Sequence, residues 1–427
     1  MHRGQPGNLV ISGLVLLNVV LWLAFLPLPN DVASPYAVQY GAEVFSSTAV
    51  ILIALALVLS SRPRFLEPYF GGLDKMYQTH KQMAVLAFLL LAAHFVLIRD
   101  HGLSIIGKPL GVAALVGIMV LALITVAPRL PLISRILYLP YDRWRISHKF
   151  LGLFFVIGIA HYLIVDAISA QTLPGQYMLV FAFIGMLAYG YKQLLARFLE
   201  PYRPYVVEAV NRLNGTCVEV SLKPTGRRLA FKAGQFVFVY FAGDPRLREP
   251  HPFTVSSSPR EDSMRLTIKA AGDWTRHLVR YLKPGTATAV YGGFGMFDYK
   301  AGGADQIWIA GGIGVTPFLS WIRDLIGGRP GMNVDFFWGV RSAEDALFLD
   351  EFEAVAERHD NFRVFARYAA RDGSMSVDQI VETTRGNLAD KHIYMCGPIG
   401  MMESFAARLK RLGVPAGQIR YEEFNFR

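Results

Sequence analysis

Four histidines lie on two apolar segments of the sequence. His80 and His94 are 14 residues apart on one segment, and His148 and His161 are 13 residues apart on the other. At about 1.5 Å per residue, each spacing spans roughly 20 Å of α-helix, which fits a hydrocarbon core of about 30 Å. Imidazoles that face each other across a helical bundle are an axial ligand set for haem. The spacing therefore predicts two stacked haems, one held by His80 and His148 and one by His94 and His161.

The four positions are not equivalent. His94 and His161 lie deep in apolar runs, where an ionisable residue is costly and usually functional. His80 and His148 lie nearer the ends of their segments, where an interfacial histidine is an ordinary alternative. At about 100° per residue, a 13-residue spacing also turns the second histidine well away from the face of the first. Either the helix is distorted near Gly158, or the two haem sites are offset around it.

Four neighbouring residues each have two interpretations. His101 lies seven residues after His94, so it is either a competing outer ligand or a loop residue. Arg99 either neutralises a haem propionate, a role that suits arginine, or only places a positive charge at a helix end. Phe154 and Phe155 lie midway between the last two histidines, and either of them could fill the gap between the macrocycles or simply pack in the bundle.

The apolar segments are long enough to span a membrane. Hydrophobic residues make up 53% of the 427 residues and charged residues 18%. Six stretches approach the ~20 residues that a spanning helix needs; they are about 9–28, 42–61, 76–98, 107–127, 146–166 and 177–199. The first is expected to be an uncleaved helix, because its apolar run is long and no small-x-small cleavage site follows. We therefore expect a six-helix bundle in the lipid bilayer over residues 1–202.

The formal net charge of +10 does not indicate a nucleic-acid partner. Basic residues gather between the second and third stretches, between or just inside the fourth and fifth, and after the sixth: Arg62, Arg64, Lys75, Arg129, Arg135, Arg143, Arg145, Lys149, Lys192, Arg197 and Arg203. Under the positive-inside rule, this pattern places both termini and everything after about residue 200 on the cytoplasmic side of the plasma or inner membrane. Cys217 and Cys396 offer neither a disulfide framework nor a zinc site.

The second half of the sequence changes to a different pattern. Alternating strands separated by Gly and Pro turns predict a small antiparallel β-barrel over residues 203–300. Over residues 301–427, strands alternate with helical segments, which predicts a parallel, doubly wound α/β domain. The loop AGGIGVTPF (310–318) follows a strand and opens a helix, so its backbone N–H groups could approach a pyrophosphate. It is not the usual G-x-G-x-x-G fingerprint. Arg341 and Arg371 each follow a strand and either contact a phosphate or lie solvated on the surface.

The sharpest motif of this half is HPFTVSSSP (251–259). The side chains of His251 and Thr254 can hydrogen-bond a ring system or a ribityl chain, while Pro252 and Phe253 fix the strand. A second motif, LTIKAAGDWT (266–275), contains a glycine turn with two groups that could meet phosphate, Lys269 and Thr275. A third turn, YGGFGMF (291–297), closes the predicted barrel.

Together these features resemble the NADPH oxidases and transmembrane ferric reductases. Members of that superfamily have six helices with two b-type haems, followed by a ferredoxin-NADP reductase-like flavin and nicotinamide module. The resemblance covers nearly the whole chain and rests on the two histidine pairs and on HPFTVSSSP, GGIGVTPF, MCGP (395–398) and EEF (422–424). It implies that FAD binds at His251, Pro252, Phe253 and Thr254, with Lys269 and Thr275 near its phosphates.

The resemblance also assigns the nicotinamide nucleotide. The glycine loop would hold it through Gly311, Gly312, Gly314, Thr316 and Pro317. Cys396 and Gly397 would approach the nicotinamide ring, although Cys396 could also be a buried structural thiol. Phe424 would stack on the isoalloxazine and yield its place to nicotinamide, with Phe426 as the alternative. Arg371 matches the position where related reductases hold the 2′-phosphate, which favours NADPH over NADH.

The function implied is electron transfer from cytoplasmic NADPH, through FAD and two haems b, to dioxygen on the outer side, with superoxide and hydrogen peroxide as products. Two other acceptors stay open: a ferric or cupric chelate, or a quinone or periplasmic partner to which the chain would donate electrons. The remaining alternative is a membrane anchor that binds haem without enzymatic activity and has a degenerate cytoplasmic module. The sequence has no calcium-binding loops and no long docking tail, so it resembles the compact bacterial type, for which no obligatory activator subunit is expected.

Overall fold

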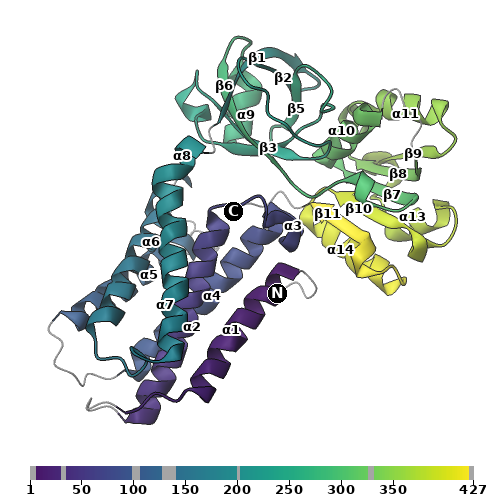
Figure 1. The fold of residues 1–427 in the computed structure, drawn as a ribbon. Helices are drawn as coiled ribbons and strands as arrows, with labels where there is room; N and C mark the ends of the chain where they lie inside the picture. The colour runs from purple at the N-terminus through teal and green to yellow at the C-terminus, as the bar shows by residue number, and fades with distance from the viewer. Residues whose placement is uncertain are drawn as a thin grey trace. The chain divides into compact units, whose positions relative to one another are not determined.

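The computed structural model describes residues 6–29, 35–98, 106–126, 141–199, 202–325 and 331–422. It divides the chain into two compact units, Met1–Leu199 and Glu200–Arg427. The first unit is helical (Figure 1), and the second contains two β-sheets with flanking helices.

The described part of the first unit contains six helices that are long and apolar enough to cross a membrane. They are α1 (Pro6–Ala24), α2 (Tyr36–Ser60), α4 (Leu73–Leu97), α5 (Gly107–Val126), α6 (Tyr141–Ile164) and α7 (Leu173–Gly190), which continues through η2 (Tyr191–Leu195) into α8 (Ala196–Leu199). A short helix, α3 (Glu67–Phe70), precedes α4. The six-helix prediction is confirmed. Five of the helices begin a few residues before the expected apolar runs, because backbone hydrogen bonding extends into polar first turns that hydropathy does not mark.

Helix packing in this unit is organised around α2. The helix α2 packs against α4 and α7, while α5 packs against α6. Close approach to α7 depends on Gly185, where a Cβ atom would come within 2.8 Å of the Cα of Ala54. Helix α1 is attached by side-chain hydrogen bonds, because the amide of Asn18 donates to Ser47 at 3.1 Å and to Thr48 at 3.0 Å. Such bonds between helices replace the water contacts that lipid cannot offer.

A buried carboxylate closes one end of the same bundle. Glu43 of α2 accepts hydrogen bonds from the backbone N–H of Ile168 at 2.9 Å and of Ser169 at 3.1 Å. It also accepts the hydroxyl of Ser169 at 2.6 Å and the amide of Gln39 at 3.2 Å. Both oxygens are therefore satisfied, as a buried charge requires. The carboxylate ties the connection between α6 and α7 to α2.

The second unit begins with a six-stranded antiparallel sheet of order β4-β3-β6-β1-β2-β5. The strands are β1 (Arg203–Arg212), β2 (Cys217–Pro224), β3 (Phe236–Phe241), β4 (His251–Thr254), β5 (Met264–Lys269) and β6 (Ala287–Phe294). A bridge from Val255 to Leu266 joins the two edge strands, so the sheet nearly closes. Helix α9 (Asp273–Tyr281) follows β5. The predicted antiparallel barrel is confirmed.

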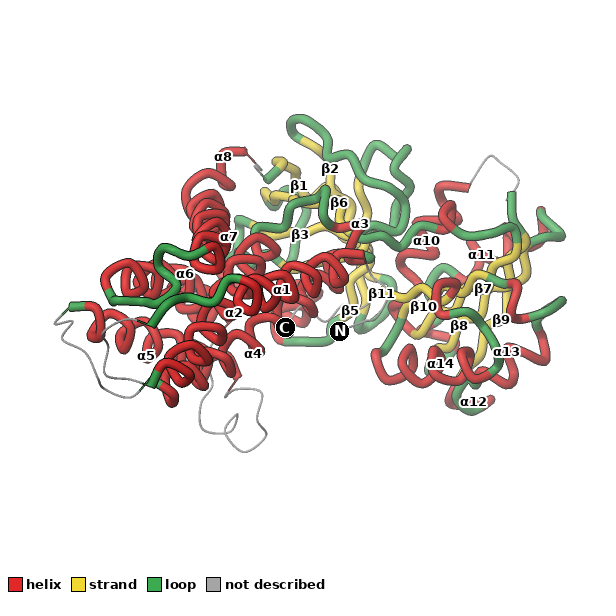
Figure 2. The backbone as a smooth tube through the Cα atoms, turned by 60° about the horizontal axis from the view of Figure 1, so that its bottom comes forward, coloured by secondary structure: helices red, strands yellow, loops and turns green. Residues whose placement is uncertain are grey.

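A five-stranded parallel sheet of order β11-β10-β7-β8-β9 follows. Its strands are β7 (Asp305–Gly311), β8 (Asn333–Val340), β9 (Phe362–Tyr368), β10 (His392–Cys396) and β11 (Ile419–Glu422). The helices that cover its two faces are α10 (Thr316–Leu325) and α11 (Leu349–Arg358) on one, and α13 (Val377–Thr383) and α14 (Ile399–Arg411) on the other; Figure 2 shows the helices around the strands. Burial on both faces explains apolar runs such as that of β7. The doubly wound prediction is confirmed.

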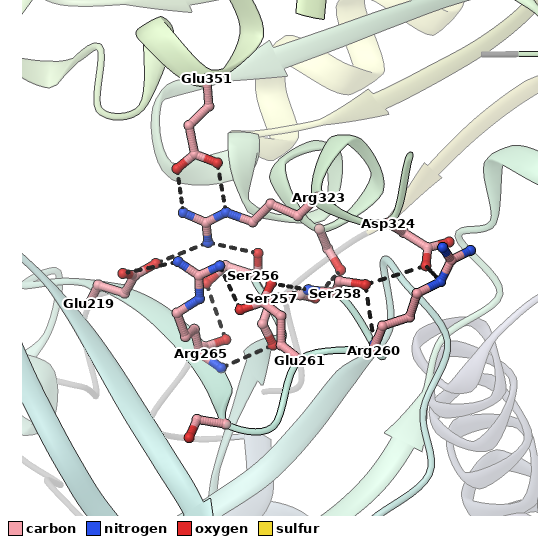
Figure 3. A network of polar contacts seen from close by, with 12 residues as sticks. Glu219, Ser256, Ser257, Ser258, Arg260, Glu261, Arg265, Arg323, Asp324 and Glu351 are labelled. Carbon is pink, nitrogen blue, oxygen red and sulfur yellow. Dashed lines mark hydrogen bonds and ion pairs between the residues drawn. The ribbon is translucent and has the colours of Figure 1, made fainter. Parts of the chain in front are cut away.

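Helix α10 joins the barrel and the parallel sheet through successive side chains. Ser320 donates to the carbonyl of Ser257 at 2.7 Å, and the indole of Trp321 donates to Ala233 at 3.2 Å. Arg323 makes the next contact through its guanidinium (Figure 3), and its side chain is only 2% exposed. The contact with Ser257 attaches α10 to the loop that follows the HPFT motif.

Arg323 is surrounded by acceptors from both domains of the unit. It donates to Glu219 of β2 at 3.0 Å, to the carbonyl of Ser256 at 3.0 Å, and to both carboxylate oxygens of Glu351 at 2.8 and 2.6 Å (Figure 3). Burial is the largest single influence on the pKa of Arg323 and by itself lowers it. The hydrogen bonds and charges of Glu351 and Glu219 together outweigh burial, so the pKa is raised. A guanidinium with its donors filled in this way holds neighbouring segments in one geometry.

The variant Arg323→Met tests this interface. It should lower the free energy of unfolding by about 3–5 kcal/mol, because the Glu219 carboxylate would lose its main partner while staying buried. Urea unfolding followed by tryptophan fluorescence measures the change. The double variant Arg323→Met/Glu219→Gln should recover part of the loss. A loss below about 1 kcal/mol, as for a surface ion pair, would contradict the assignment.

Candidate functional site

The structure places the four histidines on the two expected helices and brings one expected pair together. His80 and His94 lie on α4, and His148 and His161 lie on α6. The ring centroids of His80 and His148 are 6.4 Å apart. A metal ion about 2 Å from one nitrogen of each ring would give a separation of this size. Iron ligation by His80 with His148, and by His94 with His161, stays a prediction.

Each histidine also makes a hydrogen-bonding contact through its ring nitrogen Nδ1. The Nδ1 contacts are His80 with the carbonyl of Ala56 (2.9 Å), His94 with that of Ala42 (2.9 Å), His161 with that of Gly107 (2.8 Å), and His148 with the hydroxyl of Thr125 (3.4 Å). A carbonyl can only accept, so Nδ1 carries the proton in the first three. The proton-free Nε2 would then be the nitrogen that binds a metal, and the carbonyl fixes the ring. The residues present therefore fit haem.

Helix α6 is continuous through Gly158. The ring of Phe154 lies against α5, where a Cβ on Gly117 would come within 2.2 Å of it. Phe155 is buried in the bundle core. A bridging role for Phe154 stays a prediction. His101 and Arg99 lie outside the described residues.

The HPFT motif forms β4 and carries two signs of a ligand site. The hydroxyl of Thr254 is buried and has no hydrogen-bond partner among the described residues, and the same holds for the indole N–H of Trp274. Buried polar atoms normally have partners, and an orphan costs free energy. The ring of Trp274 stacks on His251 at 4.1 Å and on Phe253 at 5.7 Å. A flavin, with its ring and polar edge, fits these groups.

Trp274 was missed in the sequence analysis, although it stands in the motif that supplied Lys269 and Thr275. An aromatic residue two positions after a glycine, in the first turn of a helix, was the available signal. The hydroxyl of Thr275 accepts the backbone N–H groups of Ala271 and Gly272, both at 2.9 Å. It therefore caps α9, and its contact with a phosphate stays a prediction. Pro252 lies on β4 opposite Phe238.

The glycine loop is shaped by close backbone contacts with the end of β10. A Cβ on Gly314 would come within 2.2 Å of the Cys396 carbonyl oxygen, and one on Gly397 within 3.0 Å of the Cα of Gly311. Gly312 has φ +53°, which favours glycine. Helix α10 then begins with Thr316 and Pro317. Gly312 and Ile313 are the partly exposed residues of this loop, and they stand just before the start of α10, where a phosphate site would lie.

A cavity of about 660 Å³ opens beside this loop. Gly311, Gly312 and Arg341 line it, and so does Lys269, which we expected near the flavin phosphates. A volume of this size suits a dinucleotide. The cavity lies at the carboxyl ends of the parallel strands, where doubly wound folds bind ligands.

Of two arginines in β9 and the segment after it, the one that was not singled out from the sequence lines the cavity. Arg367, which the sequence analysis did not single out, lines the cavity and donates to the carbonyl of Gly373 at 2.9 Å. Arg371 is not among the described lining residues. Its guanidinium pairs with Asp372 at 2.7 Å and lies 4.9 Å from the ring centroid of Tyr368. The hydrogen bond from Arg371 lowers the pKa of the Asp372 carboxyl.

Cys396 is fully buried at the end of β10, opposite Glu422 of β11. Burial first, and the neighbouring Glu422 second, raise the pKa of its thiol well above the ordinary value. The thiol is therefore neutral near pH 7, which excludes a thiolate nucleophile. Phe424 and Phe426 lie outside the described residues, so the choice between them stays a prediction.

Comparison with known families gives three matches along the chain. Residues 45–104 match the ferric reductase like transmembrane component, residues 205–306 an FAD-binding domain, and residues 308–407 the oxidoreductase NAD-binding domain. The chain combines these three components and belongs to the NADPH oxidase/ferric reductase superfamily. It is a multi-pass membrane protein with six candidate spans.

Similar individual proteins are electron-transfer components and a flavohaemoprotein. The toluate 1,2-dioxygenase electron transfer component of Pseudomonas putida is 26% identical over 51% of this chain and 66% of its own length. The flavohemoprotein of Pseudomonas putida is 30% identical over 38% of this chain and 43% of its own. The matches thus span less than two thirds of either relative. The FAD/NAD-binding domain of nitric oxide dioxygenase from Vibrio cholerae aligns with 52% of this chain and 97% of its own, at 23% identity and TM-score 0.44.

The variant Thr254→Val tests the flavin site. Valine has nearly the shape of threonine but no hydroxyl, so the protein should lose FAD affinity by about tenfold, the worth of one hydrogen bond. The FAD-free protein should become more stable, because a buried orphan group is removed. FAD titration and thermal unfolding without FAD measure both effects. Unchanged FAD affinity would contradict the site.

Proposed function

We propose that this protein carries electrons from NADPH, through FAD and two haems b, across the membrane to dioxygen, producing superoxide and from it hydrogen peroxide. The observation that carries the proposal is the pairing of four membrane histidines with fixed tautomers in a chain that also has FAD-binding and NAD-binding domains. The bundle offers ligands for the haems, and the second unit offers places for a flavin and a dinucleotide.

When bound, the flavin would accept a hydride from NADPH and release electrons singly to haem iron. The chain's own residues supply positions and electrostatics. Thr254 would hydrogen-bond the flavin, and Trp274 would pack on it. The loop of Gly311, Gly312 and Gly314 would hold the dinucleotide, with Cys396 and Gly397 beside the nicotinamide as neutral, closely packed neighbours.

The histidine pairs decide how an acceptor meets the iron. His80 with His148 would hold one haem, and His94 with His161 the other. Because two imidazoles would hold each haem, an acceptor would take its electron without binding the iron. Dioxygen suits such outer-sphere transfer and would leave as superoxide.

The proposed cofactor preference rests on an arginine that follows β9. Arg371, always charged, would hold the 2′-phosphate, which favours NADPH over NADH. Phe424 would stack on the flavin and give way to nicotinamide, with Phe426 as the alternative. These assignments come from the resemblance of RYAARDG and EEF to the superfamily's motifs.

The expected setting is the plasma or inner membrane, with both termini and the reductase unit in the cytoplasm. The support is the gathering of Lys and Arg in alternate connections of the bundle. Dioxygen and the lipid bilayer are the partners that the proposal requires, and no activator subunit is needed.

A ferric or cupric chelate is the second candidate acceptor. The match of residues 45–104 to the ferric reductase like transmembrane component favours it. A haem edge can reduce a chelate as well as dioxygen. The two acceptors therefore have to be separated by measurement.

The test is NADPH consumption in air by the purified full-length protein with FAD, while cytochrome c reduction is followed with and without superoxide dismutase. Dismutase-sensitive reduction is the expected result. Cytochrome c reduction that superoxide dismutase does not inhibit, or activity that appears only with ferric chelate, would indicate a metal reductase instead. No NADPH consumption with any acceptor would contradict an oxidoreductase.

The haem ligands have their own test. The variant His94→Ala should lower the haem content by about half, while NADPH still bleaches the flavin. The matched control His359→Ala, in the second unit, should keep the full content. Haem and flavin absorbance measure both. Full haem content in His94→Ala would show that the ligand assignment is wrong.

A further inference from the structure

One of the four expected haem ligands has a different kind of hydrogen-bond partner from the others. His80, His94 and His161 each face a backbone carbonyl, at 2.9, 2.9 and 2.8 Å. His148 faces instead the hydroxyl of Thr125, with its Nδ1 3.4 Å from that oxygen. A carbonyl can only accept a hydrogen bond, whereas a hydroxyl can donate or accept. Which nitrogen of His148 carries the proton therefore depends on the other contacts of the Thr125 hydroxyl.

Those other contacts leave the hydroxyl only an accepting role. It donates its single proton to the carbonyl of Leu121, one turn earlier in α5, at 2.8 Å. The indole N–H of Trp144 can only donate, and it reaches the same oxygen at 3.1 Å. The oxygen then has one lone pair left and no proton to give, so Nδ1 of His148 has to be the donor. Nε2 of His148 is therefore proton-free, as in the other three histidines.

Thr125 and Trp144 reach His148 from two helices that pack against each other. Thr125 is the penultimate residue of α5, and Trp144 lies on α6, four residues before His148. Residues four apart share one face of a helix, and the ring centroids of Trp144 and His148 are 5.1 Å apart. One hydroxyl at the end of α5 thus contacts two neighbouring side chains of α6.

We propose that Thr125 and Trp144 are positioning residues that fix the tautomer of His148 and make it a weaker ligand than the other three histidines. The inference rests on the proposed function, since it concerns the haem that His80 and His148 would hold. A hydrogen bond from Nδ1 makes an imidazole a more basic ligand, and a more basic ligand stabilises ferric over ferrous iron.

The His148 bond is the longest of the four, and its acceptor also serves Trp144. An oxygen that accepts two N–H groups shares its electron density between them, so each bond is weaker than it would be alone. This contact therefore raises the reduction potential of the haem that His80 and His148 would hold, and it does not affect the other haem.

The experiment measures the midpoint potentials of both haems in the purified full-length protein by spectroelectrochemical titration. Thr125→Val keeps the shape of the side chain but removes the acceptor, so one of the two potentials should rise. The ratio of ferrous to ferric haem at a given potential should increase by about threefold, which is roughly 30 mV for a one-electron couple. The same rise should appear in Thr125→Val/His94→Ala, which should retain only the haem of His80 and His148. Thr125→Ser, which restores the hydroxyl, should restore the original potential.

The variant Trp144→Phe tests the same oxygen from its other side. It keeps an aromatic ring beside His148 but removes the N–H, so the hydroxyl accepts from His148 alone. The potential that rises in Thr125→Val should therefore fall in this variant. General loosening of the bundle would not give two shifts of opposite sign. If Thr125→Val does not fold, the fall in Trp144→Phe is the deciding measurement.

The matched control is Thr48→Val on α2. The Thr48 hydroxyl donates to the carbonyl of Val44 at 2.8 Å and accepts from the amide of Asn18 at 3.0 Å. This is the pattern of Thr125 without a histidine. Both haem potentials should therefore stay unchanged in Thr48→Val, although the free energy of unfolding should fall.

The inference is wrong if the potentials are unchanged in Thr125→Val, or if Thr125→Val and Trp144→Phe shift them in the same direction. A shift confined to the haem of His94 and His161, or an equal shift in Thr48→Val, would also contradict it. In each of these cases the protein still binds two haems, so the proposed function stands. If the unmodified protein binds no haem, the proposed function itself fails.

Discussion

The geometry of the second unit depends on the burial of one guanidinium. Arg323 is 2% exposed and binds Glu219 of the barrel and Glu351 of the parallel-sheet domain. The helix that carries it begins at the glycine loop and ends against Ser256, two residues after the HPFT motif. One rigid element of ten residues therefore connects the expected nucleotide site to the expected flavin site. A charge that is costly to bury without its partners holds both sites in one arrangement.

In the membrane unit, the equivalent constraint is that every polar group in lipid needs a hydrogen-bond partner within the protein. The four histidines meet it through Nδ1, which leaves Nε2 for the proposed haem. The carbonyl of Ala42, which accepts His94, is adjacent in sequence to Glu43, which holds the connection between α6 and α7. One turn of α2 thus orients an expected haem ligand and fixes the end of the bundle at the same time. Ligand orientation and loop closure are therefore coupled through α2.

The sequence predicted those features that depend on local pattern. Apolar length identified the six helices, alternation identified the barrel, and alternation of strands with helices identified the parallel sheet. The approach of His80 to His148 followed from spacing alone. Residues whose roles depend on distant partners were not predictable: Arg323 meets Glu219, which is 104 residues away. Lys269 of the barrel also lines the cavity beside the glycine loop, which the sequence did not indicate, because the position of a strand end depends on how two domains pack.

The central claim is that electrons pass within one chain from a nucleotide to the histidine-bound haems. The most direct test mixes NADPH with the purified protein, loaded with haem and FAD, in the absence of oxygen, and follows flavin and haem absorbance together. The account predicts that the flavin bleaches and that the haem bands then change to those of the ferrous state for both haems. Flavin bleaching with the haems left ferric would contradict it, because the two units would then not be connected by electron transfer.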